Sequence, residues 1–590
     1  MLPLLLGIIG LLWQAYVSQR GIEQFWVVAF FFFMTGIAII LYLNQTVGQP
    51  RERDYAFSGS FYAFAIWMGF GVVAIWSMLK SAIEYFTKKI KIENTAISYI
   101  PIVIALIVGI AIPLQMVSQT WDDHDRTGRY LARDYGFNYL SSLDDNAIIL
   151  TEGDNELFPL WYAQEIGGYR QDVKVVNLSY LSSDWYIKEL QYPTYNAPAV
   201  DLFAKPDVYA YGRMSRLYFP QYYGMAECVD STSIDAVTAL RNIYRDSTLH
   251  ESGKRLFPYV SVYIPYNKHA GVESGFITED EVLRATNKIR LNLTETSEKH
   301  TLFNLKDLMV LDMITRSATN GFDRPIYFAL PANEKYHLGL TPYLRGTGMA
   351  YELTPFYNSS YSQDSVIAVD TEKMYRNITK HYRWGGMDLI KNGDGVYIDE
   401  TVKNMIHTMR LSMYNLASAL WRESERYSNS SYKQERYEKI RVILSLMAEK
   451  LPLSVIEYRI CFASKLAELY IKLGSPDDLS RARELITSEI SRYSEYVNYL
   501  NSLSDRQRGI IRRGDWDAIP EIVYLSKLYA EAGGDVAQLL KSQRGANFAV
   551  MPALLNDYDE RYSVEKGELD PKVEAIKQYQ PEFERLLKSI

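Results

Sequence analysis

Long apolar runs alternate with short polar segments through the first 117 residues. Four runs stand out, at 2–17, 25–43, 61–79 and 98–117. The last three are about 19–20 residues long, which at 1.5 Å per residue is enough to cross the hydrocarbon core of a bilayer, about 30 Å thick. The pattern therefore predicts an α-helical membrane region of about four spans in residues 1–117.

The first run begins at the initiator methionine, so a signal peptide is the rival interpretation. The opening MLPLLLGIIG has no basic residue ahead of its apolar stretch, and no small-residue cleavage site follows it. These features favour a spanning helix. A chain that starts inside a span is expected to be the downstream part of something longer.

Basic residues in the loops predict the orientation of these spans. One side of the membrane would carry Arg20 and the four lysines of 80–91, and the other Arg51, Arg53 and the three arginines of 126–133. The two sides therefore hold five basic residues each. Because charges at the start of a long exported domain have less influence on orientation, we place the lysine loop in the cytoplasm and everything after residue 117 in the periplasm.

The loop between the second and third runs contains a cluster of charges. The sequence RERDY supplies Arg51, Glu52, Arg53, Asp54 and Tyr55. Unpaired charges are costly in hydrocarbon, so this turn-rich loop is expected at the membrane surface. There the arginines can hold a lipid phosphate through their planar fork of donors. The alternative is a hairpin whose charges only anchor the helices.

Residues 118–395 alternate between strand and helix patterns. A short apolar strand at 147–151 is followed by a helix at 157–166, with Pro159 in its first turn, and by a strand at 173–178. This order predicts parallel strands joined by a right-handed crossover. Further elements are expected as a helix from 185, a strand at 259–264, a helix at 305–316 and a strand at 326–330. The segment is predicted to be a periplasmic α/β domain.

The pattern becomes helical in residues 396–590. Apolar residues recur every three or four positions at Met405, Met409, Met413, Leu416 and Leu420. The stretch CFASKLAELYIKLGSPDDLSRARELI indicates a helical hairpin. Positions used by tetratricopeptide repeats are matched loosely by Ala467, Tyr470, Gly474 and Ala482. We expect an α-helical, tetratricopeptide-like domain, in which a packed helical cap is favoured over a partner-binding repeat.

Composition argues against some classes of function. The net charge is −7 and no basic stripe is present, so nucleic acid is not expected as a partner. The two cysteines, Cys228 and Cys461, are far apart, so neither a disulfide framework nor a CxxC zinc motif is predicted. The 47 tyrosines suit polar ligands and interfaces, or simply a tyrosine-rich core.

A candidate binding site follows the first predicted strand of the α/β domain. The sequence EGDNE supplies Glu152, Asp154, Asn155 and Glu156 where a strand ends and a helix begins, and ligands of open α/β sheets bind at that edge. Its acidic groups suit sugar hydroxyls or a divalent cation, and no other cofactor is expected. A stacking face would come from the nearby Trp161, Tyr162, Tyr180 and Trp185. Helix capping is the alternative use of the acidic and amide groups.

The segment TWDDHDRTGRY follows the last apolar run. It contains Asp122, Asp123, His124 and Asp125, but it lacks the HExxH motif and an i, i+4 histidine pair. A charged elbow after the last span is therefore favoured over a metal site. The chain also has no GxSxG nucleophile motif, so no catalytic residue is predicted.

Three blocks of sequence resemble a known family. They are GQPRERDYAFSGSFYAFAIWMGFG, WDDHDRTGRY and EGDNELFPLWYAQEIGGYRQDVKVVNLSYLSSDWYI. Together they resemble a family of large envelope proteins from Gram-negative bacteria, catalogued as a domain of unknown function and related to protein O-mannosyltransferase-like membrane proteins of the glycosyltransferase-C type. The similarity extends over most of residues 1–390 and is weaker in the helical tail.

The resemblance implies a multi-pass protein of the bacterial inner membrane that belongs to a system taking sugar from a polyprenyl-phosphate donor. Related enzymes carry their catalytic carboxylate in the first outer loop, and nothing in residues 1–43 resembles that loop. We therefore expect an upstream membrane half as a partner, besides the membrane and the lipid-linked donor. Arg51 and Arg53 are candidates for binding the donor phosphate. The alternative is a non-enzymatic envelope scaffold that binds glycan or protein.

Overall fold

The computed structural model describes most of the chain. The described ranges are 2–44, 53–90, 95–291, 302–330, 334–361, 366–387, 398–426, 430–511, 513–543, 545–562 and 571–589. They form two compact units, Met1–Arg126 and Thr127–Ile590. Each unit has its own internal packing.

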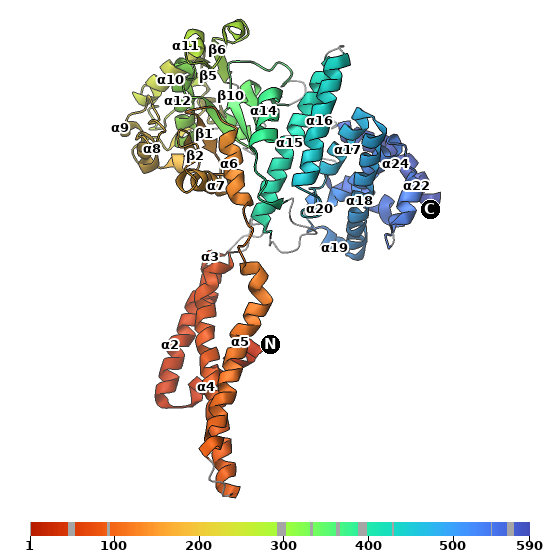
Figure 1. Ribbon diagram of the computed structural model, residues 1–590. Coiled ribbons are helices and arrows are strands. Elements are labelled where there is room, and N and C mark those ends of the chain that lie inside the picture. The colour runs from red at the N-terminus through yellow and green to blue at the C-terminus, as the bar shows by residue number, and fades with distance from the viewer. Residues whose placement is uncertain are drawn as a thin grey trace. The chain divides into compact units, whose positions relative to one another are not determined.

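The first unit is helical (Figure 1). Its helices are α1 (Leu2–Tyr16), α2 (Gln19–Thr35), α3 (Ile37–Leu43), α4 (Ser58–Ile90) and α5 (Ile100–His124). Among the described residues, three segments are long and apolar enough to cross a bilayer: Gln19–Leu43, Tyr55–Lys89 and Ala96–Trp121. Three of the four predicted runs are therefore candidate spans. The remaining run forms α1, whose 15 residues rise only about 22 Å.

The short helix α1 packs along α4. Its buried side carries Gly7, Gly10 and Gln14. A Cβ atom at Gly10 would lie 1.8 Å from the backbone oxygen of Trp67, so glycine is required for this close approach of the two backbones. Beside it, Trp67 Nε1 donates a hydrogen bond of 2.9 Å to Gln14 Oε1. Small residues and one polar contact thus specify the pairing of the first and third apolar runs.

The second unit is built around a mixed six-stranded sheet (Figure 1). In spatial order its strands are β11 (Ala368–Val369), β9 (Leu344–Gly346), β10 (Ala350–Leu353), β8 (Ile326–Ala329), β1 (Ile148–Thr151) and β2 (Lys174–Asn177). Strand β1 runs parallel to both neighbours, with Ile149 opposite Val175 and Tyr327. Strand β10 is antiparallel to β8 and β9. The parallel β1–β2 pair agrees with the predicted crossover unit.

A long segment between β2 and β8 forms two smaller sheets and several helices. Strand β3 (Arg216–Tyr218) pairs with β7 (Leu302–Asn304), and β5 (Tyr259–Pro265) lies between β4 (Asp230–Asp235) and β6 (Lys288–Leu291). The helices are α8 (Asp184–Leu190), α9 (Pro206–Tyr209), α10 (Ala236–Tyr244), α11 (Lys268–Glu273) and α12 (Leu305–Thr319). The strand expected at 259–264 and the helix expected at 305–316 are both present.

Helices cover both faces of the main sheet. Successive side chains of a strand point to opposite faces, so Ile148 and Leu150 belong to one hydrophobic core and Ile149 to another. The first core is completed by α10 and α12. The second is completed by α6 (Leu131–Ser141), α7 (Asp154–Glu165) and α15 (Glu400–Arg426). This layering around a partly parallel sheet is the α/β architecture that the sequence predicts.

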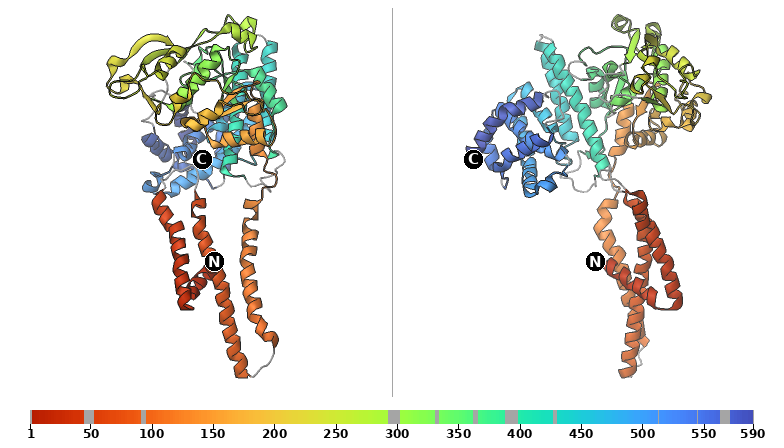
Figure 2. Two further views of the ribbon diagram at one scale, coloured as in Figure 1. Left: turned by 90° about the vertical axis from the view of Figure 1, so that its left-hand side faces the viewer. Right: turned by 180° about the vertical axis from the view of Figure 1, so that it is seen from behind.

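The rest of the second unit is helical (Figure 2). After α14 (Thr371–Arg376) and α15 come α16 (Ser430–Lys450), α17 (Phe462–Leu473), α18 (Pro476–Ser502), α19 (Asp505–Arg508), α20 (Arg513–Trp516), α21 (Ala518–Glu531), α22 (Val536–Ser542), α23 (Met551–Tyr562) and α24 (Pro571–Ser589). The apolar positions predicted for the first long helix are all buried in α15: Met405, Met409, Met413, Leu416 and Leu420. The helical tail is therefore confirmed.

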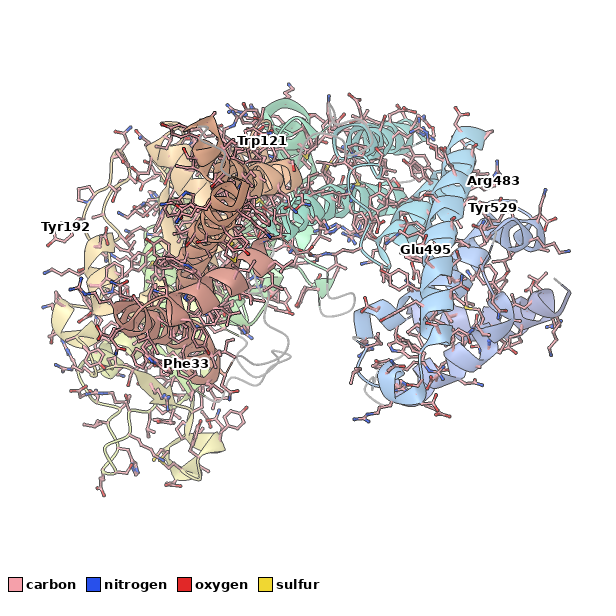
Figure 3. The ribbon with its side chains drawn as sticks, turned by 90° about the horizontal axis from the view of Figure 1, so that it is seen from below. Phe33, Trp121, Tyr192, Arg483, Glu495 and Tyr529 are labelled. Atoms are coloured by element: carbon pink, nitrogen blue, oxygen red, sulfur yellow. The ribbon has the colours of Figure 1, made fainter. Side chains whose placement is uncertain are left out.

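The predicted hairpin forms α17 and α18. Helix α17 ends at Gly474, which has a φ of 71°, and the Ser475 hydroxyl accepts a hydrogen bond of 3.2 Å from the Asp478 N–H at the start of α18. Helix α18 packs against α21, and Figure 3 labels Arg483 and Tyr529 on these two helices. Whether such hairpins form a tetratricopeptide-like array stays a prediction.

The α/β and helical regions share a hydrophobic core. One cluster of buried side chains contains Ile149 of β1 and Tyr327 of β8 together with Met409 of α15 and Leu444 of α16. Both regions lie inside one compact unit. The division into domains at 395/396 therefore stays a prediction.

Candidate ligand site at the carboxyl edge of the sheet

The EGDNE segment forms the turn between β1 and α7. The strand ends at Thr151, and the helix begins at Asp154, three residues earlier than predicted. The Glu156 carboxylate accepts a hydrogen bond of 3.2 Å from the Gly153 N–H and so caps the first turn. The side chains of Asp154 and Asn155 are exposed. Glu156 thus caps the helix, which is the role given in the sequence analysis as the alternative to ligand binding.

Pro159 lies in the second turn of α7, because the helix begins earlier than the sequence pattern indicated. Proline has no N–H, so it cannot donate the helical hydrogen bond to the carbonyl oxygen four residues earlier. That oxygen belongs to Asn155. The helix therefore presents a backbone acceptor beside the Asn155 side chain.

The strand order places this turn at a switch point of the sheet. From β1 the chain crosses to β2 on one side, and it returns later to β8 on the other side of β1. Connections that diverge in this way open a crevice at the carboxyl ends of the strands, where α/β proteins bind ligands. At this edge the Ser179 hydroxyl donates a hydrogen bond of 3.2 Å to the Glu152 carbonyl oxygen. On the β8 side the Tyr139 hydroxyl donates to the Leu330 carbonyl oxygen.

A cavity of about 270 Å³ adjoins the turn. Its lining consists of Tyr135 of α6, Asn155 and Glu156 of α7, Thr401, Asn404, Met405, His407, Thr408, Arg410 and Leu411 of α15, and Arg459 and Phe462. The structure thus joins two of the predicted site residues, Asn155 and Glu156, to a helix that comes much later in the chain. Glu152 and Asp154 belong to the adjoining turn, outside this lining.

A second cavity, of about 360 Å³, lies further along α15. Its lining includes Leu330, which follows β8, and Tyr414 and Arg422 of α15. Leu411 lines both cavities. Helix α15 therefore borders the carboxyl end of β1 with its first half and that of β8 with its second.

Arg410 is the buried cation of the first cavity. Only 1% of its surface is exposed. Its two terminal nitrogens donate hydrogen bonds of 2.8–3.2 Å to four carbonyl oxygens in the segment that follows α16. The bonded carbonyls are those of Leu451, Pro452, Ile456 and Glu457. Burial lowers the pKa of Arg410 to about 10, which still leaves the group charged at neutral pH.

Two other groups of the cavity have shifted pKa values. Burial, aided by the positive charges of Arg459 and Arg410, lowers the pKa of His407 to about 3, so the imidazole is neutral at physiological pH. Burial raises the pKa of Glu156. Arg459 also donates a hydrogen bond to the Asn404 side-chain oxygen. The cavity thus combines an imidazole, amides, a carboxyl group and guanidinium groups in positive surroundings, which suit hydroxyl-rich or anionic ligands and disfavour a divalent cation.

Two of the predicted stacking residues, Trp161 and Tyr180, pack against the hydrophobic cores of the unit, and a shared stacking face stays a prediction. Trp161 is half-buried against the core that contains α6, α7 and α15, and its ring centre lies 5.9 Å from that of Phe158. Trp185 instead lies 6.4 Å from Tyr180 and 5.6 Å from Tyr186, which belongs to the core on the opposite face of the sheet. Tyr180 packs against both cores, and it thereby links the side of Trp161 with the side of Trp185.

The charged loop of the first unit is described only in part. Arg51 and Glu52 lie outside the described residues, as does the side chain of Asp54. Arg53 is exposed, and its carbonyl oxygen accepts a hydrogen bond of 2.9 Å from the Ala56 N–H at the start of a short helix. Tyr55 is 64% exposed. The phosphate-binding role of this loop stays a prediction.

The elbow after the last span is also described in part. The side chains of Asp122 and Asp123 lie outside the described residues. His124 Nδ1 lies 2.8 Å from the Thr120 carbonyl oxygen, one helical turn earlier, inside α5. The elbow interpretation of the segment stays a prediction.

The sequence pattern did not predict the cavity residues of α15. His407 and Arg410 lie between the apolar positions of an amphipathic helix, where polar residues usually face solvent. One signal was present in the sequence: Arg410 directly follows Met409 and precedes Leu411 and Ser412, so it lies close to the buried stripe. The partners that bury it follow about 40 residues later and are backbone groups, which no side-chain pattern identifies.

Three candidate spans and an α/β region with a cavity at its carboxyl edge together indicate a membrane protein with an α/β domain. Residues 132–373 match the model of a family described as TMEM260-associated domain 2. The matched segment contains all six strands of the main sheet and the EGDNE turn, and it ends before α15. No curated protein and no solved structure was matched. The family description names no activity.

Proposed function

We propose that this chain is the carboxyl-terminal part of an inner-membrane glycosyltransferase that uses a polyprenyl-phosphate-linked sugar, and that the α7–α15 cavity binds the saccharide. The observation that carries the proposal is the lining of that cavity. Asn155 and Glu156 from the carboxyl edge of the sheet face a neutral histidine and two arginines across about 270 Å³. That volume is close to the lower end of the range for small-molecule sites, which begins at about 300 Å³.

The chemistry of the lining fits a sugar that carries a phosphate. Amide and carboxyl groups pair with hydroxyls, and guanidinium groups pair with phosphate oxygens through their planar fork. Buried Arg410 is held by four carbonyl oxygens, so it supplies charge, whereas exposed Arg459 is placed to contact a ligand. Glu156 is partly engaged by the Gly153 N–H, which suits binding better than proton transfer.

A lipid-linked donor requires a protein that meets the membrane. The three candidate spans supply that contact, and Arg53 is exposed beside the start of α4. Arg51 and Arg53 are separate candidates for binding a donor phosphate at the periplasmic surface of the bacterial inner membrane, independently of the cavity. An upstream membrane half supplies the catalytic carboxylate.

A binding experiment on the full chain in lipid nanodiscs tests the proposal. The probes are a panel of polyprenyl-phosphate-linked hexoses and the matching hexose phosphates. Asn155→Ala and Glu156→Gln should each weaken binding about 10-fold, since a lost hydrogen bond to a polar ligand costs about 1–1.5 kcal/mol. Glutamine retains an oxygen that can cap α7, so the helix start is preserved.

Asp154→Ala is the matched control, because Asp154 is exposed in the same turn but lies outside the cavity lining. It should leave affinity unchanged. Equal affinities for all three variants and the unaltered chain would reject the cavity as the saccharide site. A further outcome is that the chain binds saccharide in vitro while envelope proteins are still glycosylated normally in cells that lack the chain. That combination would favour the second candidate, a non-enzymatic glycan-binding scaffold. The helix pairs α15–α16 and α17–α18 are the feature that favours this scaffold role.

A further inference from the structure

A separate group of polar side chains lies in the segment between β2 and β8, outside both cavities. Glu227, Cys228 and His250 each offer one ligand atom, and these atoms all lie within 4.8 Å of one another. Glu227 is exposed, and Cys228 and His250 are half-buried. The three donors are brought together from two turns that are 22 residues apart in the chain.

We propose that Glu227, Cys228 and His250 bind a zinc-type divalent ion. A thiolate, an imidazole and a carboxylate are the ligand types that zinc takes in proteins, and borderline-soft ions are selected by the sulfur. One thiolate and one carboxylate balance the double positive charge of the ion, with a neutral histidine as third ligand. Three protein ligands leave the fourth tetrahedral position open, and the exposure of Glu227 lets water reach it.

The first two donors are held by a tight turn. Residues Ala226–Cys228 form a single 3-10 turn. The Cys228 N–H donates to the Met225 carbonyl oxygen over 2.9 Å, and the Val229 N–H donates to the Ala226 carbonyl oxygen over 3.2 Å. The turn therefore fixes the backbone of both Glu227 and Cys228 without a metal.

The third donor is held by a small hairpin. The His250 N–H donates to the Lys254 carbonyl oxygen over 2.9 Å, and the Gly253 N–H donates back to the His250 carbonyl oxygen over 2.8 Å. His250 Nδ1 also lies 2.7 Å from the Ser252 hydroxyl. Together with the hydrogen bond of 3.1 Å that Nδ1 accepts from the Ser252 N–H, that contact fixes the plane of the ring. Binding of an ion through Nε2 requires the ring proton to move to Nδ1, where the Ser252 hydroxyl can accept it.

Backbone hydrogen bonds tie the two turns to one frame. The Phe257 N–H donates to the Tyr218 carbonyl oxygen over 2.9 Å, which joins the hairpin to β3. The Asp230 N–H donates to the Pro258 carbonyl oxygen over 2.8 Å, which joins the hairpin to the strand after the Cys228 turn. The donors are thus positioned by the fold before an ion arrives, so little ordering is required on binding.

Cobalt titration of the metal-free full chain in detergent tests the proposal. Co²⁺ takes zinc sites and gives a thiolate-to-metal charge-transfer absorption when sulfur binds it. We expect one Co²⁺ per chain with that absorption, and its displacement by Zn²⁺. Cys228→Ser should remove the absorption, and His250→Gln should weaken binding at least about 100-fold, because even outer-shell partners of a metal are worth 10–100-fold. Zn²⁺ should also raise the melting temperature of the unaltered chain, because binding stabilises the folded state.

Cys461→Ser is the control, since it removes the other cysteine of the chain and should leave the spectrum unchanged. Glu227→Gln, an exposed change that spares the fold, should weaken Co²⁺ about 10-fold or more while the charge-transfer absorption persists. The proposal is overturned if Co²⁺ gives no saturable absorption, if the absorption lacks a thiolate component, or if it follows Cys461 instead of Cys228. Far-ultraviolet circular dichroism confirms that each variant is folded.

Discussion

Arg410 and His407 illustrate how single residues acquire their properties from the fold. They lie three positions apart on α15, and each is surrounded by groups from other parts of the chain. Arg410 closes the carbonyl-rich end of α16, and its charge contributes to the low pKa of His407. The cavity therefore holds one positive charge in a residue whose two terminal nitrogens are already bonded, and an uncharged imidazole beside it.

The low pKa of His407 predicts a pH dependence of stability. In the unfolded chain a histidine takes up its proton near pH 6.5, whereas the folded protein holds the pKa of His407 at about 3. Between these values the unfolded state binds one more proton, so stability falls as the pH falls, by at most about 1.4 kcal/mol per pH unit. His407→Gln should therefore lose less stability than the unaltered chain when the pH drops from 7 to 4. The measurement is the thermal unfolding midpoint of the full chain in detergent at both values.

His269→Gln serves as the reference for that experiment. His269 is 85% exposed at its side chain on α11, far along the chain from the cavity. This variant should lose as much stability as the unaltered chain when the pH drops from 7 to 4. If His407→Gln also follows the unaltered chain, the imidazole is not desolvated in the folded state and the description of the cavity is wrong.

At the scale of elements, the carboxyl edge depends on how closely α6 and α7 pack. These helices are neighbours on one face of the sheet, and α7 carries Asn155 and Glu156 into the cavity while α6 carries Tyr135. A Cβ atom at Gly136 of α6 would lie 2.1 Å from the Pro159 carbonyl oxygen of α7. The absence of a side chain at this position sets the separation of the two helices.

Gly136→Ala should destabilise the protein by about 1–3 kcal/mol, the usual cost of overpacking, because backbone atoms must move apart. It should also weaken saccharide binding, because α7 carries two of the lining residues. Gly514→Ala is the matched control: Gly514 lies in the short helix α20, and its Cβ would meet open space. This control should be neutral or stabilising by up to about 1 kcal/mol. Equal unfolding midpoints for the two variants would contradict the close approach of α6 and α7.

At the scale of the whole molecule, the orientation in the membrane decides what the second unit meets. The basic residues of the loops balance, so the expected periplasmic position rests on the weaker influence of charges that precede a long domain. We predict that a reporter enzyme active only in the periplasm is active when fused after Ile590 and silent when fused after Lys89. Enzyme activity per unit of fusion protein, measured in a Gram-negative host, checks this. The opposite pattern would place the cavity in the cytoplasm, away from the proposed donor.

Sequence pattern alone determined the order and type of many elements. Apolar runs of about 20 residues gave the candidate spans, and apolar positions at helical spacing gave the buried side of α15. These features are local, because a strand or an amphipathic helix shows its period within a dozen residues. The start of α7 was placed too late because the cap is made by Glu156 reaching back to Gly153.

The candidate sites were decided only by the tertiary structure. The turn after β1 was predictable from its position at a strand end, but its partners Thr401, His407 and Arg459 come from segments that follow about 250–300 residues later. The Glu227–Cys228 turn likewise meets His250 through backbone hydrogen bonds that no motif spacing encodes. Sequence period reports which face of an element is buried, whereas a cavity, a shifted pKa or a ligand set depends on which faces meet, and that is fixed only when the whole unit packs.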